Sequence, residues 1–311
     1  MQLEKIKCPV CDSGENKEAI RSKDFRYKLS DEYFSIVKCK KCSFLFLNPR
    51  PRKEELYKFY PPYFYTKDKS IFYKLIEPMF LIAQKSIIRQ FKKHKTNGRS
   101  LDIGCGNGGF VSAMLESGFD ASGIEPNPEA EKFIDEYLKG RIVFKDIKDC
   151  AFESRKFDII TCFQSLEHVS DLGRVLKKVA RILKDDGLLY ISVPNAGFFE
   201  FKLFGAYSYN LEVPRHLYFF KRPTLTKLLK GNGFNNIKFL KYTFFEPVFT
   251  PASFYESINY YFSSSKMKIY KIIRPLIFVP LIFVRFVARV LYLFEDQNIN
   301  LVCSKANVSY T

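Results

Sequence analysis

From residue 97 onward, short apolar runs alternate with helical stretches of ten to fifteen residues. The stretches FVSAMLES (110–117) and RPTLTKLLKGNGF (222–234) illustrate the helical pattern. Alternation of this kind predicts an α/β fold with a doubly wound, mostly parallel sheet. We expect seven strands: SLDI (100–103), a run ending at Glu125, a run ending at Asp146, the start of 157–169, the end of 183–195, part of 233–245, and 298–305. In 183–195 we expect a helix end and a turn before the strand.

A glycine-rich turn follows the first expected strand. Residues 101–110 read LDIGCGNGGF, in which Gly104 and Gly106 allow a sharp turn and leave room for a ligand, while Gly108 and Gly109 open a helix. Glu125 ends the second run. An acid beyond a second strand, facing a glycine-rich first turn, is how the ribose hydroxyls of a nucleoside are held.

The glycine spacing alone leaves the ligand open. Gly104, Gly106 and Gly109 also fit the GxGxxG pattern of NAD-binding folds, and a turn that only connects a strand to a helix would use the same residues. Asp102 favours a different ligand. Its carboxylate suits the cationic amino group of a methionine-like tail, whereas it would repel a pyrophosphate.

With Asp102, Gly104, Gly106 and Gly108 in place, the turn resembles motif I of the class I S-adenosylmethionine-dependent methyltransferases. The resemblance covers about residues 97–306 and implies S-adenosylmethionine as cofactor. Asp102 and the glycines would then hold its methionine end and Glu125 its ribose. The resemblance also implies cofactor contacts near the adenine and at the end of the fourth strand, from Asp146, Ile147 and Phe163.

Four cysteines near the N-terminus form two C-x2-C pairs, at Cys8 and Cys11 and at Cys39 and Cys42. This spacing suits one tetrahedral zinc ion, and four protein ligands would make its role structural. Disulfides are the alternative, but the chain shows no secretory leader, which favours metal. The remaining four cysteines read as inert buried thiols.

The chain is long enough for a full core and an accessory module. We expect a zinc module at 1–50, a helical connector and candidate lid at 51–96, and the cofactor-binding domain at 97–311, with a basic apolar insertion at about 243–297. Paired C-x2-C, a following LNPRP and a tyrosine-rich segment resemble the zinc-bearing methyltransferases of bacterial polysaccharide and deoxysugar pathways. The resemblance implies a lid that includes Tyr60, Tyr63 or Tyr65; packing between modules is the alternative.

Three residues are candidates for orienting or deprotonating an acceptor. His168 follows the fourth strand, where ligands of such folds bind, although it could instead cap a helix. Glu167 beside it could equally be an acid placed favourably in a helix's first turn. His216 lies in a loop where the family often carries Pro-x-His, and Tyr207 and Tyr209 of the same loop could line the acceptor pocket.

The formal net charge is +17. Between residues 266 and 294 there are six basic residues and no acid, but the uncharged run from Pro275 to Val284 is too short to span a bilayer and contains Pro280. Such a segment fits an anionic membrane surface, where each Lys or Arg contributes about 1 kcal/mol. A helix packed on the sheet or in a dimer interface is the alternative.

Taken together, these features predict a cytoplasmic enzyme, peripheral at the inner face of the membrane, that methylates a nucleotide-linked or lipid-linked saccharide in surface polysaccharide or deoxysugar biosynthesis. The alternatives are a zinc-ribbon RNA methyltransferase, a quinone or lipid O-methyltransferase at the membrane surface, and a non-catalytic binding module. An RNA acceptor is disfavoured because the densest group of basic residues lies in apolar sequence. In addition, the fourth strand ends in FQSLEHV and not in the Asn/Asp-Pro-Pro-aromatic element of base N-methylating enzymes.

Overall fold

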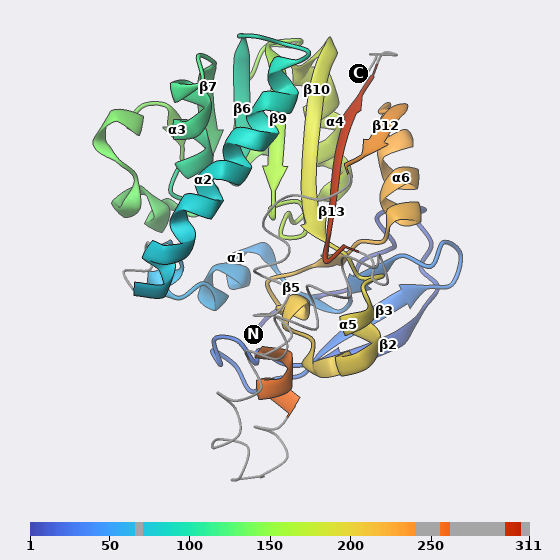
Figure 1. Cartoon of the computed structure of the whole chain (residues 1–311). Coiled ribbons are helices and arrows are strands. Elements are labelled where there is room, and N and C mark those ends of the chain that lie inside the picture. The colour runs from blue at the N-terminus through green and yellow to red at the C-terminus, as the bar shows by residue number, and fades with distance from the viewer. Residues whose placement is uncertain (66–70, 241–255, 262–295, 306–311) are drawn as a thin grey trace, which may run out of the picture. The chain divides into compact units, whose positions relative to one another are not determined.

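The computed structural model describes residues 1–65, 71–240, 256–261 and 296–305. The chain forms two compact units, each assembled from separate stretches of sequence (Figure 1). Unit 1 comprises Met1–Tyr60, Pro194–Thr224 and Phe245–Asn298, and unit 2 comprises Pro61–Val193, Leu225–Phe244 and Ile299–Thr311.

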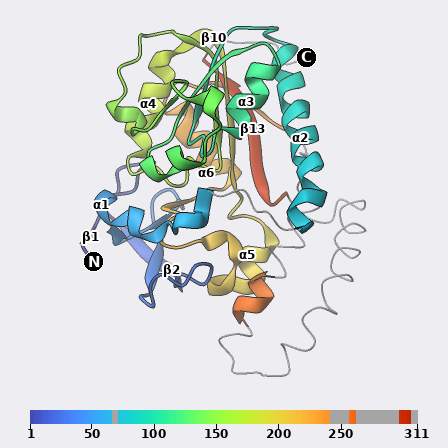
Figure 2. The same ribbon diagram turned by 90° about the vertical axis from the view of Figure 1, so that its left-hand side faces the viewer.

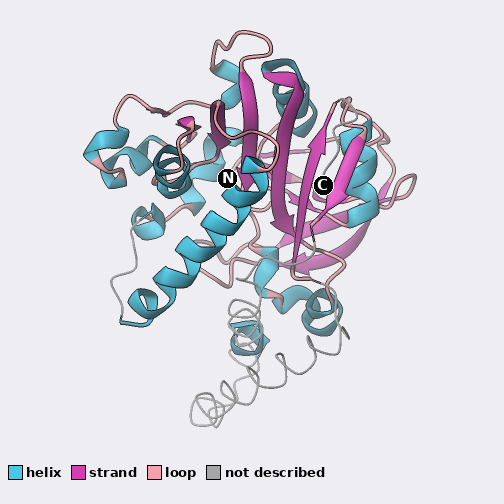
Figure 3. Ribbon diagram, turned by 45° about the horizontal axis from the view of Figure 1, so that its top comes forward, coloured by secondary structure: helices cyan, strands magenta, loops and turns pink. Residues whose placement is uncertain are grey.

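Unit 2 contains a central sheet flanked by helices (Figure 3). Its seven strands lie in the order β12-β13-β10-β9-β6-β7-β8. Strands β10, β9, β6, β7 and β8 pair in parallel, and β12 pairs antiparallel with β13. The prediction of a doubly wound, mostly parallel seven-stranded sheet is therefore confirmed. The strand bounds are β6 Arg99–Ile103, β7 Asp120–Ile124, β8 Ile142–Val143, β9 Phe157–Phe163, β10 Leu183–Pro194, β12 Asn236–Phe239 and β13 Asn298–Ser304.

Helices cover both faces of this sheet. Helices α2 (Ile71–Lys92) and α3 (Gly109–Glu116) lie on one face, and α4 (Leu172–Ile182) and α6 (Arg222–Lys230) lie on the other (Figure 2). Under α2 and α3 the core includes Phe91, Val111, Met114 and Tyr190. In α4 the buried residues recur at the spacing of one helix face, and Asp171 caps its first turn by accepting from the Arg174 N–H.

Unit 1 is built around a four-stranded antiparallel sheet in the order β11-β4-β3-β2. Its strands are β2 Asn16–Ser22, β3 Phe34–Cys39, β4 Leu45–Leu47 and β11 Tyr218–Phe219, and a separate pair joins β1 Leu3–Glu4 to β5 Arg50–Pro51. Helices α1 (Lys53–Leu56) and α5 (Phe199–Phe204) belong to the same unit. Phe44, Phe46, Tyr218 and Phe220 pack their rings together, which brings residues near 220 to the N-terminal sheet.

Two local predictions need correction. The expected turn before the fifth strand is instead part of β10, which runs from Leu183 and changes register between Leu183 and Leu188. The third strand ends at Val143 rather than Asp146, because Asp146 caps the 3-10 turn Ile147–Asp149.

Other predictions fall partly outside the described residues. The predicted boundaries at residues 50 and 96 stay a prediction. Of the insertion at about 243–297, the structure describes 256–261, which is helical, and 296–297, so the segment 266–294 lies outside the described residues. Within the part of the chain that the structure describes, no helix is long and apolar enough to cross a membrane.

Candidate functional site

The glycine turn links β6 to α3, and three of its glycines adopt left-handed backbone angles. Gly104, Gly106 and Gly108 have φ of 75°, 54° and 82°. A Cβ on Gly104 would lie 2.4 Å from Ser165 Cβ, and one on Gly108 would lie 2.6 Å from a methyl carbon of Ile142. A Cβ on Gly106 would meet nothing within 4 Å. Two of the glycines thus serve close packing, and only Gly106 leaves the open approach that was expected at both Gly104 and Gly106.

Glu125 lies directly after β7 and is bound to this turn. Its carboxylate accepts hydrogen bonds from the Gly106 N–H at 3.1 Å and from the Asn127 N–H at 3.0 Å. The side chain is buried, and burial raises its pKa, although these two N–H groups act in the opposite direction. The predicted meeting of the acid and the glycine turn is therefore present, with a carboxylate available to accept from ribose hydroxyls.

Asp102 lies on β6, beneath the turn. The register of β6 with β9 sets it opposite Thr161, whose hydroxyl donates to Asp102 Oδ1 at 2.7 Å. Burial raises the pKa of Asp102 to about 7, with a smaller contribution from Glu125, while the Thr161 hydrogen bond opposes the shift. Its predicted contact with a cofactor amino group stays a prediction.

The other predicted cofactor residues occupy different places. Asp146 accepts from the Lys148 N–H at 3.1 Å, and Ile147 beside it is buried. Phe163 ends β9 and packs its ring 4.4 Å from Phe110 and 4.7 Å from Tyr190, measured between centroids. Phe163 therefore contributes to the core of unit 2, whatever its role toward a ligand.

Of the predicted lid residues, Tyr65 reaches the site. Its hydroxyl donates to Glu125 Oε1 at 3.2 Å. The Tyr65 hydroxyl therefore uses a carboxylate oxygen that could also accept a hydrogen bond from a ribose hydroxyl. Tyr60 belongs to unit 1, and the side chain of Tyr63 lies outside the described part of the structure. The contact between Tyr65 and Glu125 is what a lid residue would make, but a closing movement stays a prediction.

The turn after β9 carries Glu167 and His168. The His168 N–H donates to the Ser165 carbonyl at 3.1 Å, which closes the turn. Glu167 is fully buried, and burial raises its pKa to about 8. Because Ser165 occupies the space beside Gly104, this turn packs directly on the glycine turn.

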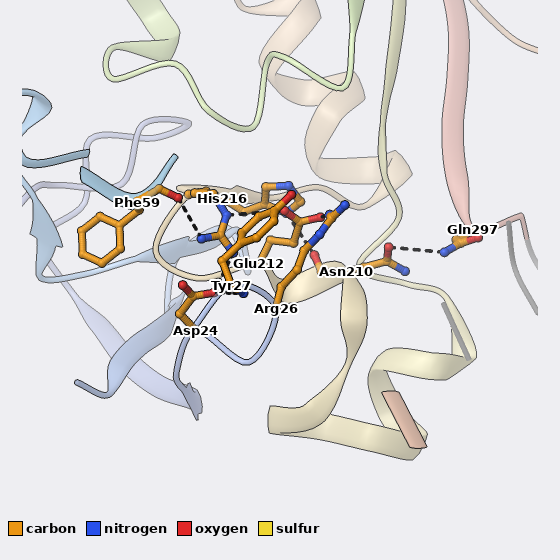
Figure 4. Close-up of polar contacts among 9 residues, drawn as sticks. Asp24, Arg26, Tyr27, Phe59, Asn210, Glu212, His216 and Gln297 are labelled. Atoms are coloured by element: carbon orange, nitrogen blue, oxygen red, sulfur yellow. Dashed lines mark hydrogen bonds and ion pairs between the residues drawn. The ribbon is translucent and has the colours of Figure 1, made fainter. Parts of the chain in front are cut away.

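His216 belongs to unit 1, where Asn210 orients its ring (Figure 4). The Asn210 carbonyl oxygen lies 3.0 Å from His216 Nδ1. A carbonyl can only accept, so Nδ1 is the donor, and in a neutral imidazole Nε2 is then the nitrogen with a lone pair. This tautomer is the one that a general base at Nε2 would require.

A buried ion pair beside His216 was not predicted. Arg215 Nη2 lies 2.8 Å from Asp24 Oδ1, and both side chains are fully buried. Arg215 also donates to the Phe59 carbonyl at 3.1 Å and stacks over Tyr27 at 4.5 Å. The pair ties the loop before β11 to the N-terminal segment. Nothing in the local sequence around Asp24 signals it, because the partners are 191 residues apart.

The four N-terminal cysteines come together in unit 1. Their sulfur atoms all lie within 4.8 Å of one another, with Cys8 Sγ 3.4 Å from Cys42 Sγ and Cys11 Sγ 3.5 Å from Cys39 Sγ. All four are free thiols. A zinc ion with bonds of about 2.3 Å to four sulfurs would separate them by about 3.8 Å, so the cluster fits a tetrahedral metal.

The two cysteine pairs have the same local geometry. In each pair, the residue four positions after the first cysteine donates its N–H to that cysteine's carbonyl: Asp12 to Cys8 at 2.8 Å and Ser43 to Cys39 at 3.0 Å. Both donors have positive φ, at 57° and 63°. The repeated turn points two thiols from each pair toward one centre, as the C-x2-C spacing predicted.

A separate cavity of about 260 Å³ lies elsewhere in unit 2, between the end of α2 and residues of β10, β12 and β13. Its lining includes His94, Lys238 and Val302 but no residue of the glycine turn. This cavity is therefore not the predicted cofactor site.

Two proteins named ubiquinone biosynthesis O-methyltransferase are similar in part. The one from Glaesserella parasuis is 34% identical over 115 residues, which are 32% of this chain and 49% of that protein. The one from Coxiella burnetii is 33% identical over 122 residues, 36% of this chain and 51% of that protein. The chain thus spans about half the length of these curated relatives.

A crystal structure of a SAM-dependent methyltransferase from Archaeoglobus fulgidus is 17% identical, covers 75% of this chain and 99% of its own, and has a TM-score of 0.48. Residues 75–238, more than half of the chain, match the family model described as a methyltransferase domain. They include the glycine turn, Glu125 and the turn after β9. The chain therefore belongs to the methyltransferase domain family and carries its class I fold.

Proposed function

We propose that this protein transfers a methyl group from S-adenosylmethionine to a small acceptor. The observation that carries the proposal is the carboxylate of Glu125 held at the glycine turn by the Gly106 N–H. It adjoins Gly106, the one glycine of the motif whose α-carbon faces open space. An acceptor for ribose hydroxyls thus lies beside a backbone that a ligand can approach closely.

When bound, S-adenosylmethionine supplies an activated methyl group, which passes to the acceptor as its bond to sulfur breaks and the electron pair stays on sulfur. The chain's own residues must orient the acceptor, exclude water and take the proton that a neutral acceptor loses. Glu167, His168 and His216 remain the proposed catalytic candidates. His216 Nε2 has the tautomer that suits proton abstraction.

For the acceptor, the relatives favour a hydroxyl group of a quinone precursor, because they are named for O-methylation in ubiquinone biosynthesis. The sequence alone left this acceptor as one alternative, and the named relatives make it the first candidate. A saccharide is the second candidate. It is supported by the cysteine cluster in unit 1, which accompanies the sequence layout that resembles sugar methyltransferases.

The two acceptors can be separated directly. Purified protein is incubated with S-adenosylmethionine labelled in its methyl group and with either a prenylated catechol or a panel of nucleotide-linked and polyprenyl-linked sugars. We expect label in the catechol product. Label only in a sugar would establish the second candidate, and binding of the cofactor without transfer to either class would contradict both acceptors.

We also propose that the four clustered cysteines bind one structural zinc ion. Four thiolates would complete a tetrahedral shell and leave no open position for chemistry. The supporting observations are the sulfur separations and the repeated turn geometry of the two pairs.

A further inference from the structure

The cavity at the end of α2 combines an apolar lining with basic side chains. Three of its lining residues are apolar and buried: Phe91, Leu188 and Val302. Three others are basic, two of them exposed and His94 half-buried: Lys93, His94 and Lys238. None of the described residues that line the cavity is acidic. This combination suits a ligand with an apolar body and a negatively charged head group.

The backbone brings these residues together within unit 2. Lys238 of β12 lies directly opposite Val302 of β13, and directly opposite residues of an antiparallel pair share one face of the sheet. The His94 N–H donates to the Phe91 carbonyl at 2.9 Å, which closes the last turn of α2. This bond engages a carbonyl group at the helix end that would otherwise repel an anion.

The basic side chains of the cavity act on one another. Burial lowers the pKa of His94, and the charges of Lys238 and Lys93 lower it further. Both ammonium groups are therefore close enough to the imidazole ring to affect its charge. An anion in the cavity would be attracted to both lysines and would offset their mutual repulsion.

The acids of β10 that precede this cavity are bound by other cations. Asp185 Oδ1 lies 3.0 Å from Lys305 Nζ, and the carboxylate of Asp186 pairs with Lys95. Neither Lys305 nor Lys95 belongs to the lining. These acids therefore do little to neutralise the lysines of the cavity.

The volume of the cavity limits the size of the ligand. An apolar cavity of about 150 Å³ holds one benzene ring. At about 260 Å³, this cavity has room for a ring and a short chain that ends in a head group. It is smaller than the roughly 300 to 1,000 Å³ of sites for drug-sized ligands.

The cavity is separate from the glycine turn. Leu188 pairs with Ile159 of β9, which pairs in turn with Ser100, the second residue of β6. The glycine turn begins at Gly104, four residues further along, or about 13 Å at the rise of a strand. The cavity thus lies toward the amino ends of the parallel strands, so that both sites can be occupied at once.

We propose that this cavity is a second ligand site, which binds a small organic anion through an apolar body and one carboxylate or phosphate head group. The body packs against the buried apolar residues, and the head group lies beside Lys93 and Lys238. The inference is independent of the proposed function, because no residue of the glycine turn takes part.

Calorimetry with a simple probe tests the site. The probe is 3-phenylpropanoate, which has one ring, a short chain and a carboxylate. Two comparison compounds separate its parts: 3-phenylpropan-1-ol keeps the apolar body without the charge, and propanoate keeps the charge without the ring. Each compound is titrated into the full-length protein at low ionic strength, where charge attraction is least screened. The probe titration is repeated with S-adenosylmethionine present.

We expect one probe to bind per chain, more tightly than either comparison compound and equally well with S-adenosylmethionine present. Lys93→Gln and Lys238→Gln should each weaken probe binding about two- to fivefold, the range for exposed ion pairs. The double variant should weaken it by on the order of tenfold. Lys92→Gln is the matched control, because Lys92 is an exposed residue of the last turn of α2 that does not line the cavity. This variant should bind the probe as the wild type does.

Histidine signals in nuclear magnetic resonance spectra locate the bound probe. The ring signals of His94 should shift on titration and its pKa should rise, because a nearby anion stabilises the imidazolium. The signals of His168, which follows β9 at the carboxyl ends of the strands, should stay in place.

Three results would overturn the inference. The first is no saturable binding of the probe, and the second is equal affinity for 3-phenylpropan-1-ol. The third is a loss of affinity in Lys92→Gln as large as that in Lys238→Gln. Displacement of the probe by S-adenosylmethionine would also overturn it, since the probe would then occupy the cofactor site, and the proposed function would stand.

Discussion

At the residue scale, the three glycines of the turn are alike in sequence and different in role. All three have positive φ, yet Gly104 and Gly108 are enclosed by side chains and Gly106 is open. The sequence could predict the turn and its meeting with Glu125, because both follow from spacing within a βαβ unit. It could not predict that Ser165 fills the space above Gly104, because that contact depends on the path of the chain after β9, outside this βαβ unit.

The difference between the glycines gives a test by substitution. Gly104→Ala should lower the free energy of unfolding by at least about 2 kcal/mol, from the clash with Ser165 and the positive φ together. Gly106→Ala should cost about 1 to 2 kcal/mol for its backbone conformation alone and should weaken cofactor binding more than it weakens the fold. Urea unfolding and calorimetry measure the two effects.

Gly118→Ala is the control for these variants, since Gly118 has φ of 89° and open space around it but lies at the far end of α3. It should cost stability without changing cofactor affinity. If Gly106→Ala and Gly118→Ala affected binding equally, Gly106 would not be the point of ligand approach.

At the element scale, the strands with continuous apolar runs were predictable and the irregular ones were not. The second strand ends just before Glu125 as expected, because β7 is bounded by its own apolar pattern. Asp185, Asp186 and Gly187 predicted a turn, but β10 continues through them with a change of register. Pairing with β9 on both sides of this irregularity outweighs the local turn preference.

The geometry of the two cysteine pairs allows a direct test for bound metal. Protein purified without chelator should contain one zinc per chain, and Cys39→Ser should lose it. Cys39 ends β3, which pairs with both β2 and β4, so hydrogen exchange should increase across all three strands while unit 2 stays protected.

Cys150→Ser is the matched control for the metal, because Cys150 is a buried thiol outside the cluster. This variant should retain its zinc. Protein without stoichiometric zinc, or a Cys39→Ser variant that keeps both its metal and its exchange protection, would contradict the zinc assignment.

At the scale of the whole molecule, the chain crosses between its two units several times. Pro194–Thr224 belongs with the N-terminal residues, because the two-residue strand β11 pairs with β4 and Arg215 pairs with Asp24. Neither feature has a signal in the local sequence. The predicted contact of residues 266–294 with an anionic membrane surface remains a prediction from the sequence.

The free energy of unfolding should depend on pH in a direction set by two buried carboxyl groups of unit 2, those of Asp102 and Glu167. The pKa values of Asp102 and Glu167 are raised by burial to about 7 and about 8. The folded state therefore holds more protons than the unfolded state between about pH 4 and pH 8, and stability is lost as pH rises through this range. Thermal unfolding between about pH 5 and pH 8 should show a falling midpoint.

Glu167→Gln and Asp102→Asn should each flatten that dependence, since each removes one titrating group. A midpoint that rises over the same range in the wild type, or an unchanged slope in both variants, would mean that these carboxyl groups are ionised in the folded protein.

The central claim is that the glycine turn and Glu125 hold S-adenosylmethionine, and calorimetric titration tests it most directly. We predict that the wild type binds S-adenosylmethionine and not NAD. Glu125→Ala should weaken binding by about 1.5 to 3 kcal/mol, the range for hydrogen bonds to a charged group. Binding of NAD in place of S-adenosylmethionine, or unchanged affinity in Glu125→Ala, would contradict the account.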